Sequence, residues 1–311
     1  HNGIKSLICL PAGAPISKIE ATKRLGAEVC LVPGVYDDAY AKAIELKEEK
    51  GYTFVHPFND PKVIAGQGTI GLEILEEMPG VEAIVVPVGG GGLIAGVAFA
   101  VKTLRPDIKI YGVQAAGAPS MAESMKKHER VHLDSVSTVA DGIAVKEPGD
   151  LTYELCERYV DEIVTVNDDE IAAAILALIE KQKLVAEGAG AAAVAAAMFG
   201  KLPLEGKKVV CLVSGGNIDV NILSRVINRG LLKNGRLCQL ELEVPDKPGT
   251  LSQVLKVVAD HGGNVLSVSH ERVAASSQIN ACTLHLELET LDHNHVSRLK
   301  AALGEAGFPV A

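Results

Sequence analysis

The stretch from Val85 to Gly96 constrains the fold more than any other part of this sequence. It reads Val-Val-Pro-Val-Gly-Gly-Gly-Gly-Leu-Ile-Ala-Gly, so an apolar run typical of a buried strand leads through four glycines into a helical pattern. Residues without side chains let backbone N–H groups turn toward one point and approach a ligand closely. A helix that begins near Leu93 adds the positive end of its dipole. The pattern therefore predicts a binding site for a phosphate group.

Composition limits the class of protein. The chain has 311 residues and a net charge of −9, without a marked cluster of Lys or Arg, so we expect neither nucleic acid nor a membrane surface as a partner. No apolar run approaches the ~20 residues of a membrane span, and we expect no signal peptide. The six cysteines show no Cys-x-x-Cys pair, which favours reduced structural thiols in a cytoplasmic protein. We expect no metal site, because His56, His128 and His132 lack ligand spacing.

Short apolar runs alternate with helical patterns up to about residue 115. Strands are predicted at 6–10, 27–32, 52–56, 81–88 and 108–113, and helices at 17–25, 36–50, 64–77 and 93–104. The pattern is looser from 116 to 160, and then predicts helices at 168–182, 188–198 and 221–232 and a strand at 208–213. Repeated βα units with nearly continuous apolar strands indicate an α/β fold with a parallel sheet that helices cover on both faces.

The pattern changes after Lys233-Asn234-Gly235, which looks like a linker. Leu240, Leu242 and Val244 alternate with polar residues, as in a half-exposed antiparallel strand. The order that follows is βαββα, with 308–310 as a possible last strand, and it predicts a ferredoxin-like α+β module.

The glycine run has two other interpretations. Gly90 to Ala95 satisfies the dinucleotide pattern G-x-G-x-x-A, but such a site needs an acid about 20 residues further on, and the next strand ends Tyr111-Gly112-Val113-Gln114 without one. A tight turn that binds nothing is disfavoured, because four glycines cost much backbone entropy.

Five motifs in order carry a family resemblance. They are Pro61-Lys62-Val63-Ile64-Ala65-Gly66-Gln67-Gly68-Thr69, Val86-Pro87-Val88 with the four glycines, Ala140-Asp141-Gly142, Glu187-Gly188-Ala189-Gly190, and Ser214-Gly215-Gly216-Asn217-Ile218-Asp219. Together they resemble fold type II pyridoxal-phosphate enzymes (tryptophan synthase β-like), specifically threonine/serine dehydratases, also called threonine ammonia-lyases. Residues 236–311 resemble an ACT domain. The resemblance implies the remainder of a small subdomain at 1–62, a large cofactor domain at 63–232 and an ACT-like regulatory domain at 236–311.

The resemblance implies pyridoxal 5'-phosphate as cofactor and gives several residues a role. The backbone of the glycine run would hold the phosphate, Gly142 would lie near the ring, Ser214 would face the pyridine nitrogen, and Glu187 would approach the ring. The structural alternatives are a turn hydroxyl for Ser214 and a capping or surface acid for Glu187. The implied cofactor residues are thus Gly89, Gly90, Gly91, Gly92, Leu93, Gly142, Glu187 and Ser214.

The implied activity is deamination of L-threonine, and of L-serine, to 2-oxobutanoate or pyruvate and ammonia. The ACT-like module would bind an amino-acid effector, with isoleucine or valine feedback as the natural expectation, through Gly249, Thr250, Leu251 and Asn264. Its alternative role is pairing without a ligand. Edge-to-edge pairing of such sheets would make the protein a homo-oligomer, a dimer or tetramer.

The sequence departs from the family at the catalytic lysine, which is not recognisable in residues 1–311. We expect this lysine in a segment before His1, and residues 1–311 alone to be inactive. Two alternatives remain: a non-catalytic amino-acid sensor that has lost the lysine, and a serine racemase. The racemase is disfavoured because the positions of its metal-binding acids read Gln114, Ala118 and Ser120 here.

Overall fold

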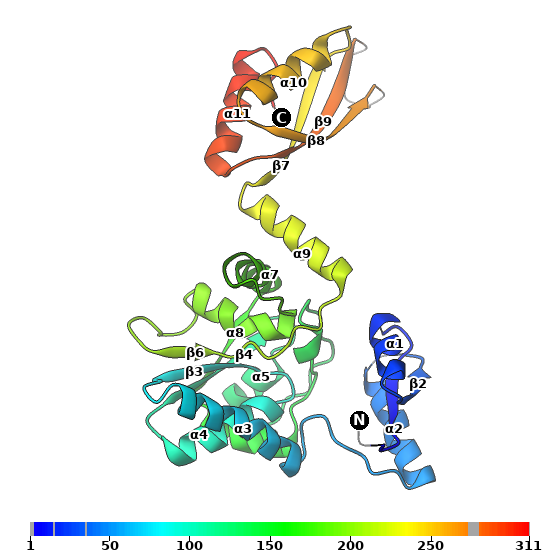
Figure 1. Cartoon of the computed structure of the whole chain (residues 1–311), viewed down its shortest axis with the longest axis vertical. Coiled ribbons are helices and arrows are strands. Elements are labelled where there is room, and N and C mark those ends of the chain that lie inside the picture. The colour runs from blue at the N-terminus through cyan, green and yellow to red at the C-terminus, as the bar shows by residue number, and fades with distance from the viewer. Residues whose placement is uncertain (1–2, 15, 35, 273–279, 311) are drawn as a thin grey trace. The chain divides into compact units, whose positions relative to one another are not determined.

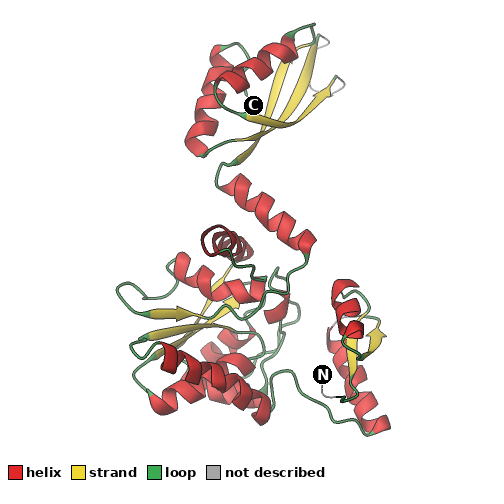
Figure 2. Cartoon of the chain, in the orientation of Figure 1, coloured by secondary structure: helices red, strands yellow, loops and turns green. Residues whose placement is uncertain are grey.

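The computed structural model describes residues 3–14, 16–34, 36–272 and 280–310. Contacts divide the chain into two units, His1–Val220 and Asn221–Ala311. Figure 1 labels the elements along the chain, and Figure 2 separates helices from strands by colour.

The first unit begins with a two-stranded parallel sheet. Strands β1 (Leu7–Pro11) and β2 (Glu28–Val32) pair in register, and helices α1 (Ile16–Arg24) and α2 (Tyr36–Lys50) each follow one of them. These four elements match the predicted order of strand and helix.

The predicted strand at 52–56 does not form. In the described part of the chain this segment pairs with no strand and runs as a loop into α3. Its side chains instead pack edge to face, with ring centroids of Tyr40 and Phe54 5.6 Å apart and those of Phe54 and His56 6.0 Å apart. The aromatic residues that suggested a strand therefore serve ring packing.

The central sheet of the first unit contains four parallel strands in the order β5-β4-β3-β6. The strands are β3 (Ala83–Pro87), β4 (Lys109–Ala115), β5 (Glu162–Val166) and β6 (Val209–Cys211). The helices are α3 (Pro61–Glu77), α4 (Gly92–Leu104), α5 (Ser120–Lys127), α6 (Asp150–Tyr159), α7 (Asp168–Ala177) and α8 (Gly188–Met198), with a 3₁₀ turn η1 (Asp141–Ile143) and a π turn η2 (Leu178–Gln182).

Helices cover both faces of this sheet, as predicted. Figure 1 shows α3 and α4 on one face and α7 and α8 on the other. Every residue of β3 is buried, because β3 lies inside the sheet between β4 and β6. Such a strand must be apolar throughout, which is why Ile84 and Val86 are fully buried.

The stretch from 116 to 166 contains elements that the sequence did not predict. Helices α5 and α6 and strand β5 all lie here. Helix α6 buries Thr152, Tyr153 and Cys156, a narrow face that includes a polar residue and so gives a weak hydrophobic pattern. Asn167 caps α7, and its side chain accepts a hydrogen bond from Glu170 N at 2.9 Å.

The second unit has the predicted βαββα order. Its strands are β7 (Leu237–Pro245), β8 (Asn264–Glu271) and β9 (Ala281–Glu289), in the antiparallel order β7-β9-β8. Its helices are α9 (Val220–Lys233), α10 (Thr250–Asp260) and α11 (His293–Glu305). Leu240, Leu242, Val254 and Leu299 belong to its core. The possible last strand is a single bridge between Val310 and Leu242.

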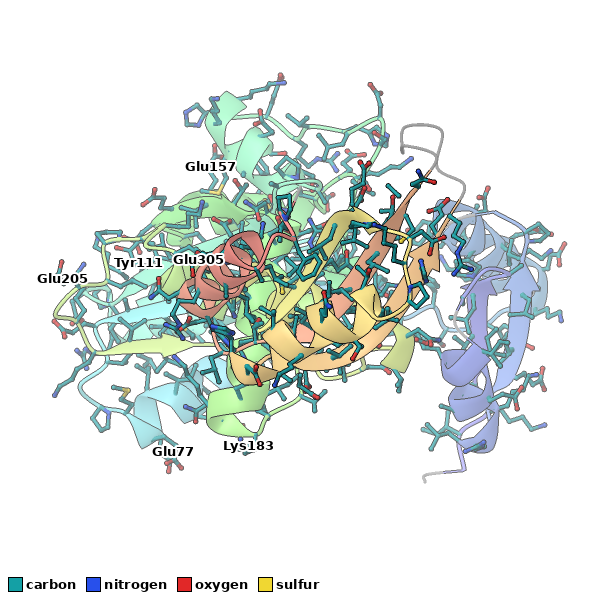
Figure 3. The ribbon with its side chains drawn as sticks, turned by 90° about the horizontal axis from the view of Figure 1, so that it is seen from above. Glu77, Tyr111, Glu157, Lys183, Glu205 and Glu305 are labelled. Carbon is teal, nitrogen blue, oxygen red and sulfur yellow. The ribbon has the colours of Figure 1, made fainter. Side chains whose placement is uncertain are left out.

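Charged side chains lie on the surface of the first unit. Figure 3 shows Glu77, Lys183 and Glu205 extending away from the ribbon of the first unit, and all three residues are exposed. Among the helices of the described residues, none has the length and apolar character needed to cross a bilayer.

Candidate functional site

The glycine run forms the turn between buried strand β3 and helix α4. Gly91 is the residue before α4 and has a φ of 95°, which is left-handed and favours glycine. No side chain caps this helix. The N–H groups of its first turn, which includes Leu93, therefore have no intrahelical acceptor and point out of the helix start.

Close protein contacts also require glycine in this turn. A Cβ at Gly90 would lie 2.5 Å from the Phe58 ring, and one at Gly92 would lie 2.8 Å from Phe58 Cβ. A Cβ at Gly91 would lie 2.5 Å from Met121 Cε and 2.9 Å from Thr152 Cβ. Real Cβ atoms almost never approach so closely, so packing and ligand access both favour glycine.

The topology brings the Ser214 motif to the same edge of the sheet. Strands β3 and β6 are parallel neighbours, with Val85 opposite Cys211. Their carboxyl ends therefore lead into adjacent loops, one holding the glycine run and the other holding Ser214 and Gly215. Ligands of open parallel sheets bind at this edge. Ser214 itself is exposed.

Gly142 and Glu187 connect these two loops. The position of a Cβ on Gly89 lies 3.5 Å from Gly142 O, and that of a Cβ on Gly142 lies 3.5 Å from Glu187 Oε1. Glu187 N donates to Gly215 O at 3.0 Å, and its carboxylate contacts Gly215. The structure thus brings all the predicted cofactor residues into one region.

The carboxyl of Glu187 has a shifted pKa. Burial raises the pKa of its carboxyl above the usual value, and the nearby charge of Asp141 adds to this. Lys18, whose Nζ lies 3.1 Å from Asp141 Oδ2, and a hydrogen bond from the Asn217 backbone oppose the increase. Glu187 is therefore more readily protonated than an ordinary glutamate.

Several residues that support the glycine run were not predicted. Thr152 Oγ1 donates to Gly90 O at 2.6 Å from helix α6 and is fully buried. Asn59 Nδ2 donates to Asp150 Oδ1 at 2.6 Å, and Asn59 Oδ1 accepts from Leu151 N at 3.1 Å. The signal that could have found Asn59 is the following Asp-Pro pair, which begins a helix.

His56 fixes the turn that presents Phe58 to the glycines. Its Nδ1 accepts hydrogen bonds from Phe58 N at 3.2 Å and from Asn59 N at 2.8 Å. Burial lowers the pKa of His56 below 6.5, against the raising effect of Asp60 and Asp150. The neutral imidazole is the form that can accept these bonds.

These residues fit the phosphate of pyridoxal phosphate. The uncapped start of α4 offers N–H donors, and residues 89–92 place no side chain of their own beside them, while the Phe58 ring packs against Gly90. The half-buried carboxyl of Glu187 and the hydroxyl of Ser214 lie at the same sheet edge, where a ring attached to that phosphate could reach them.

The predicted effector residues fall at two ends of the second unit. Gly249 has a φ of 92° and precedes α10, whose first turn holds Thr250 and Leu251 without a capping side chain. Asn264 lies opposite Glu289, at the far end of strand β9 from Ala281 and Pro245. This end is roughly 25 Å away along the strand. The structure therefore does not bring Asn264 together with the other three in one chain, because β8 runs in the same direction as β7.

The positions that bear on a racemase are buried and neutral. Gln114, Ala118 and Ser120 are all fully buried. Gln114 Oε1 accepts from Ala122 N at 2.8 Å, while Gln114 Nε2 and Ser120 Oγ have no partner within the described chain. No carboxylate is present at these three positions to hold a hard divalent ion.

Comparison with protein families shows which class of protein has this fold and site. The sequence model described as "Pyridoxal-phosphate dependent enzyme" matches residues 1–215, and that of the ACT domain matches residues 239–305. The chain therefore belongs to the pyridoxal-phosphate-dependent enzymes of fold type II, with a C-terminal ACT domain.

Individual relatives narrow this class. The chain is 52% identical over 308 residues to an L-threonine ammonia-lyase of Thermotoga maritima, covering 99% of this chain and 77% of that protein. A processed threonine deaminase isoform from Solanum lycopersicum superposes with a TM-score of 0.69 at 40% identity, covering 73% of this chain and 67% of that one. Maize serine racemase superposes with a TM-score of 0.68 at 35% identity, covering 74% and 71%.

Proposed function

We propose that this protein is an L-threonine ammonia-lyase that converts L-threonine to 2-oxobutanoate and ammonia, and L-serine to pyruvate and ammonia. The observation that carries the proposal is the 52% identity to an L-threonine ammonia-lyase across 99% of the chain. The geometry supports it, because the glycine run, Gly142, Glu187 and Ser214 meet at one sheet edge.

Different residues of this chain would contact different parts of the cofactor. The backbone N–H groups of Gly89 to Gly92 and Leu93 would hold the phosphate at the start of α4. Ser214 would present a neutral hydroxyl to the ring nitrogen, and Glu187, whose carboxyl protonates readily, would lie beside the ring. Pyridoxal phosphate supplies the electron sink for the charge left by the departing α-proton.

A neutral partner at Ser214 has a chemical consequence. A hydroxyl leaves the ring nitrogen less protonated than a carboxylate would, so the ring withdraws electrons less strongly. This favours loss of the β-hydroxyl over transfer of the amino group.

The racemase alternative is supported by the likeness of the fold to that of maize serine racemase. It is disfavoured here because Gln114, Ala118 and Ser120 offer no carboxylate. The sensor alternative has the ACT domain in its favour. Release of product by the protein decides between the sensor and the enzyme.

We infer that the ACT domain binds an amino-acid effector at the start of α10. Gly249 permits the turn, in which Thr250 N donates to Lys247 O at 3.3 Å, so the backbone N–H of Leu251 and the hydroxyl of Thr250 would serve the carboxylate. Asn264 would join such a site only from a second chain. A homo-oligomer is supported by strand β8, which lies at the sheet edge and exposes Leu266 and Val268. A cytoplasmic location is supported by six cysteines without a disulfide in the described chain.

The test is product release by protein made from the whole gene and loaded with pyridoxal phosphate. We expect L-threonine to yield ammonia and 2-oxobutanoate in equal amounts. Ser214→Ala should lower kcat, and Ser297→Ala, which changes an exposed serine of helix α11 in the second unit, serves as the control. Cofactor binding without product would support the sensor, and serine racemisation faster than deamination would support the racemase.

A further inference from the structure

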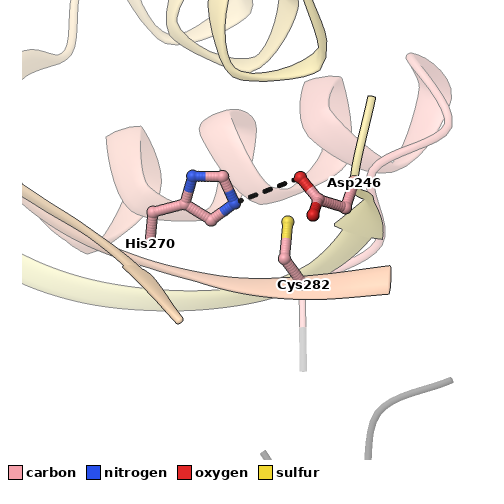
Figure 4. Close-up of side chains that lie close together, drawn as sticks. All are labelled: Asp246, His270 and Cys282. Carbon is pink, nitrogen blue, oxygen red and sulfur yellow. Dashed lines mark ion pairs between the residues drawn. The ribbon is translucent and has the colours of Figure 1, made fainter. Parts of the chain in front are cut away.

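The second unit holds a cluster of side chains that the proposed function does not use. Asp246, His270 and Cys282 each offer one ligand atom, and these atoms all lie within 4.8 Å of one another. Figure 4 shows the imidazole, thiol and carboxylate converging at the end of the sheet, with an ion pair between His270 Nε2 and Asp246 Oδ1 at 3.8 Å. Three neighbouring strands position them.

The strand register explains why they converge. Leu284 lies opposite His270 in the β8–β9 pair, and Cys282 is two residues before Leu284 on the same face of β9. Cys282 lies opposite Val244 in the β7–β9 pair, so Asp246 follows directly at the end of β7. Asp246 N donates to Asn280 O at 2.9 Å, which fixes the acid beside the start of β9.

The three donors are those that zinc takes in proteins. Tetrahedral Zn²⁺ with bonds of roughly 2.0–2.3 Å separates its ligands by roughly 3.3–3.8 Å. The His270–Asp246 distance of 3.8 Å lies a few tenths of an ångström beyond the roughly 3.3–3.5 Å expected for one nitrogen and one oxygen ligand. The three ligand atoms all lie within 4.8 Å of one another. Side-chain rotations that move a ligand atom by about 1 Å would therefore complete the site. Three protein ligands leave a fourth position for water.

The surroundings suit a metal with one buried and two accessible ligands. Cys282 is 2% exposed, while the side chains of His270 and Asp246 are 30% and 33% exposed and offer a path for the ion. Arg272 Nε donates to Asp246 Oδ2 at 2.9 Å, which leaves Oδ1 directed at His270. Such a hydrogen bond to the second carboxylate oxygen is how outer partners orient a metal ligand.

Burial raises the pKa of the Cys282 thiol, as does the charge of Asp246, and Arg272 opposes the increase. A thiol must lose its proton to bind a metal, so metal binding here would release a proton. We propose that Asp246, His270 and Cys282 form a binding site for one zinc-like divalent transition-metal ion in the ACT domain.

The test uses Co²⁺ as the probe, titrated into the full chain with difference spectra recorded against metal-free protein. We expect one equivalent to give a thiolate-to-cobalt charge-transfer band in the near ultraviolet and visible bands typical of tetrahedral cobalt. Cys282→Ser should abolish the charge-transfer band. Cys238→Ser, which changes another buried cysteine of the same core, should keep it.

His270→Gln keeps the proposal testable if the Cys282 variant folds poorly, because His270 lies at the surface. It should weaken Zn²⁺ binding, measured by competition with a chelator, by more than about 100-fold. Loss of a residue that only hydrogen-bonds to a metal ligand costs less than this. His285→Gln, on the same sheet but outside the cluster, is the control and should bind as before. No charge-transfer band at one equivalent, or unchanged zinc affinity in His270→Gln, would overturn the proposal and leave an ion-paired cluster without a metal.

Discussion

Replacement of Gly91 by alanine tests the glycine run most severely. The φ of 95° places any side chain in the left-handed region. The new Cβ would lie 2.5 Å from Met121 Cε and 2.9 Å from Thr152 Cβ. The methionine end can move, but Thr152 cannot, because its hydroxyl is bound to Gly90 O at 2.6 Å.

Two costs add for this variant. The left-handed backbone costs an alanine about 1–2 kcal/mol, and overpacking a buried site costs typically about 1–3 kcal/mol. With Met121 yielding, we expect a loss of roughly 2–4 kcal/mol in the free energy of unfolding. The matched control is Gly66→Ala in helix α3, where no atom lies within 4 Å of the new Cβ and φ is not positive. It should gain about 0.5–1 kcal/mol, as Gly-to-Ala changes in helices do.

The assay combines urea unfolding with titration of pyridoxal phosphate and of pyridoxal, which lacks the phosphate. Gly91→Ala should weaken binding of pyridoxal phosphate at least tenfold and affect pyridoxal much less. Gly66→Ala should bind both as the parent protein does. The reasoning is refuted if Gly91→Ala unfolds at the parent's urea midpoint and binds pyridoxal phosphate with an unchanged Kd.

Three further predictions concern the residues around this turn. Thr152→Val removes the donor to Gly90 O and should cost about 1–3 kcal/mol in urea unfolding, while Thr152→Ser should retain most stability; equal stability of both variants would contradict this. The lowered pKa of His56 means that the unfolded chain binds the proton first, so stability should fall as pH falls through about 6.5. His56→Asn, which keeps an acceptor but does not titrate, should lose that part of the pH dependence of unfolding. The raised pKa of Glu187 has the opposite sign, so its contribution to stability is lost as pH rises; Glu187→Gln should gain stability relative to the parent at neutral pH and not at pH of about 4.

The sequence predicted the parallel sheet because its inner strands are apolar at most positions, and β3 at every position. Strand β3 and helix α4 follow from Val85 to Gly96, where a buried run, a turn and a helix each have a local signal. The half-exposed strand β7 was equally clear, since its alternation of Leu and Glu has a period of two. Local sequence patterns are enough to predict an element whose two faces are each uniformly buried or uniformly exposed.

Helices α5 and α6 could not be predicted in this way. Helix α6 buries a threonine toward the glycine turn, and that contact depends on Gly90 O, far away in the sequence. The segment 52–56 was misassigned for the same reason: its aromatic residues pack on Tyr40 and His56 and not on a neighbouring strand. Tertiary contacts outweigh local propensity at these places.

The sequence predicted the residues of the candidate cofactor site. It did not predict the residues that pack around the glycine run. Each glycine motif follows a strand, so the sheet edge could be expected to gather them. Phe58, Asn59 and Thr152 carry no such signal, because their roles arise only when α3 and α6 pack beside the turn. Asn264 was grouped with Gly249 because the direction of β8 relative to β7 is a property of the sheet and not of either strand.

The central claim is that the backbone of residues 89–92 holds the phosphate of the cofactor. A crystal structure of the protein with bound pyridoxal phosphate tests it most directly. The account predicts phosphate oxygens within hydrogen-bonding distance of the N–H groups of Gly89 to Gly92 at the start of α4. A phosphate bound at any other loop of the sheet would contradict it.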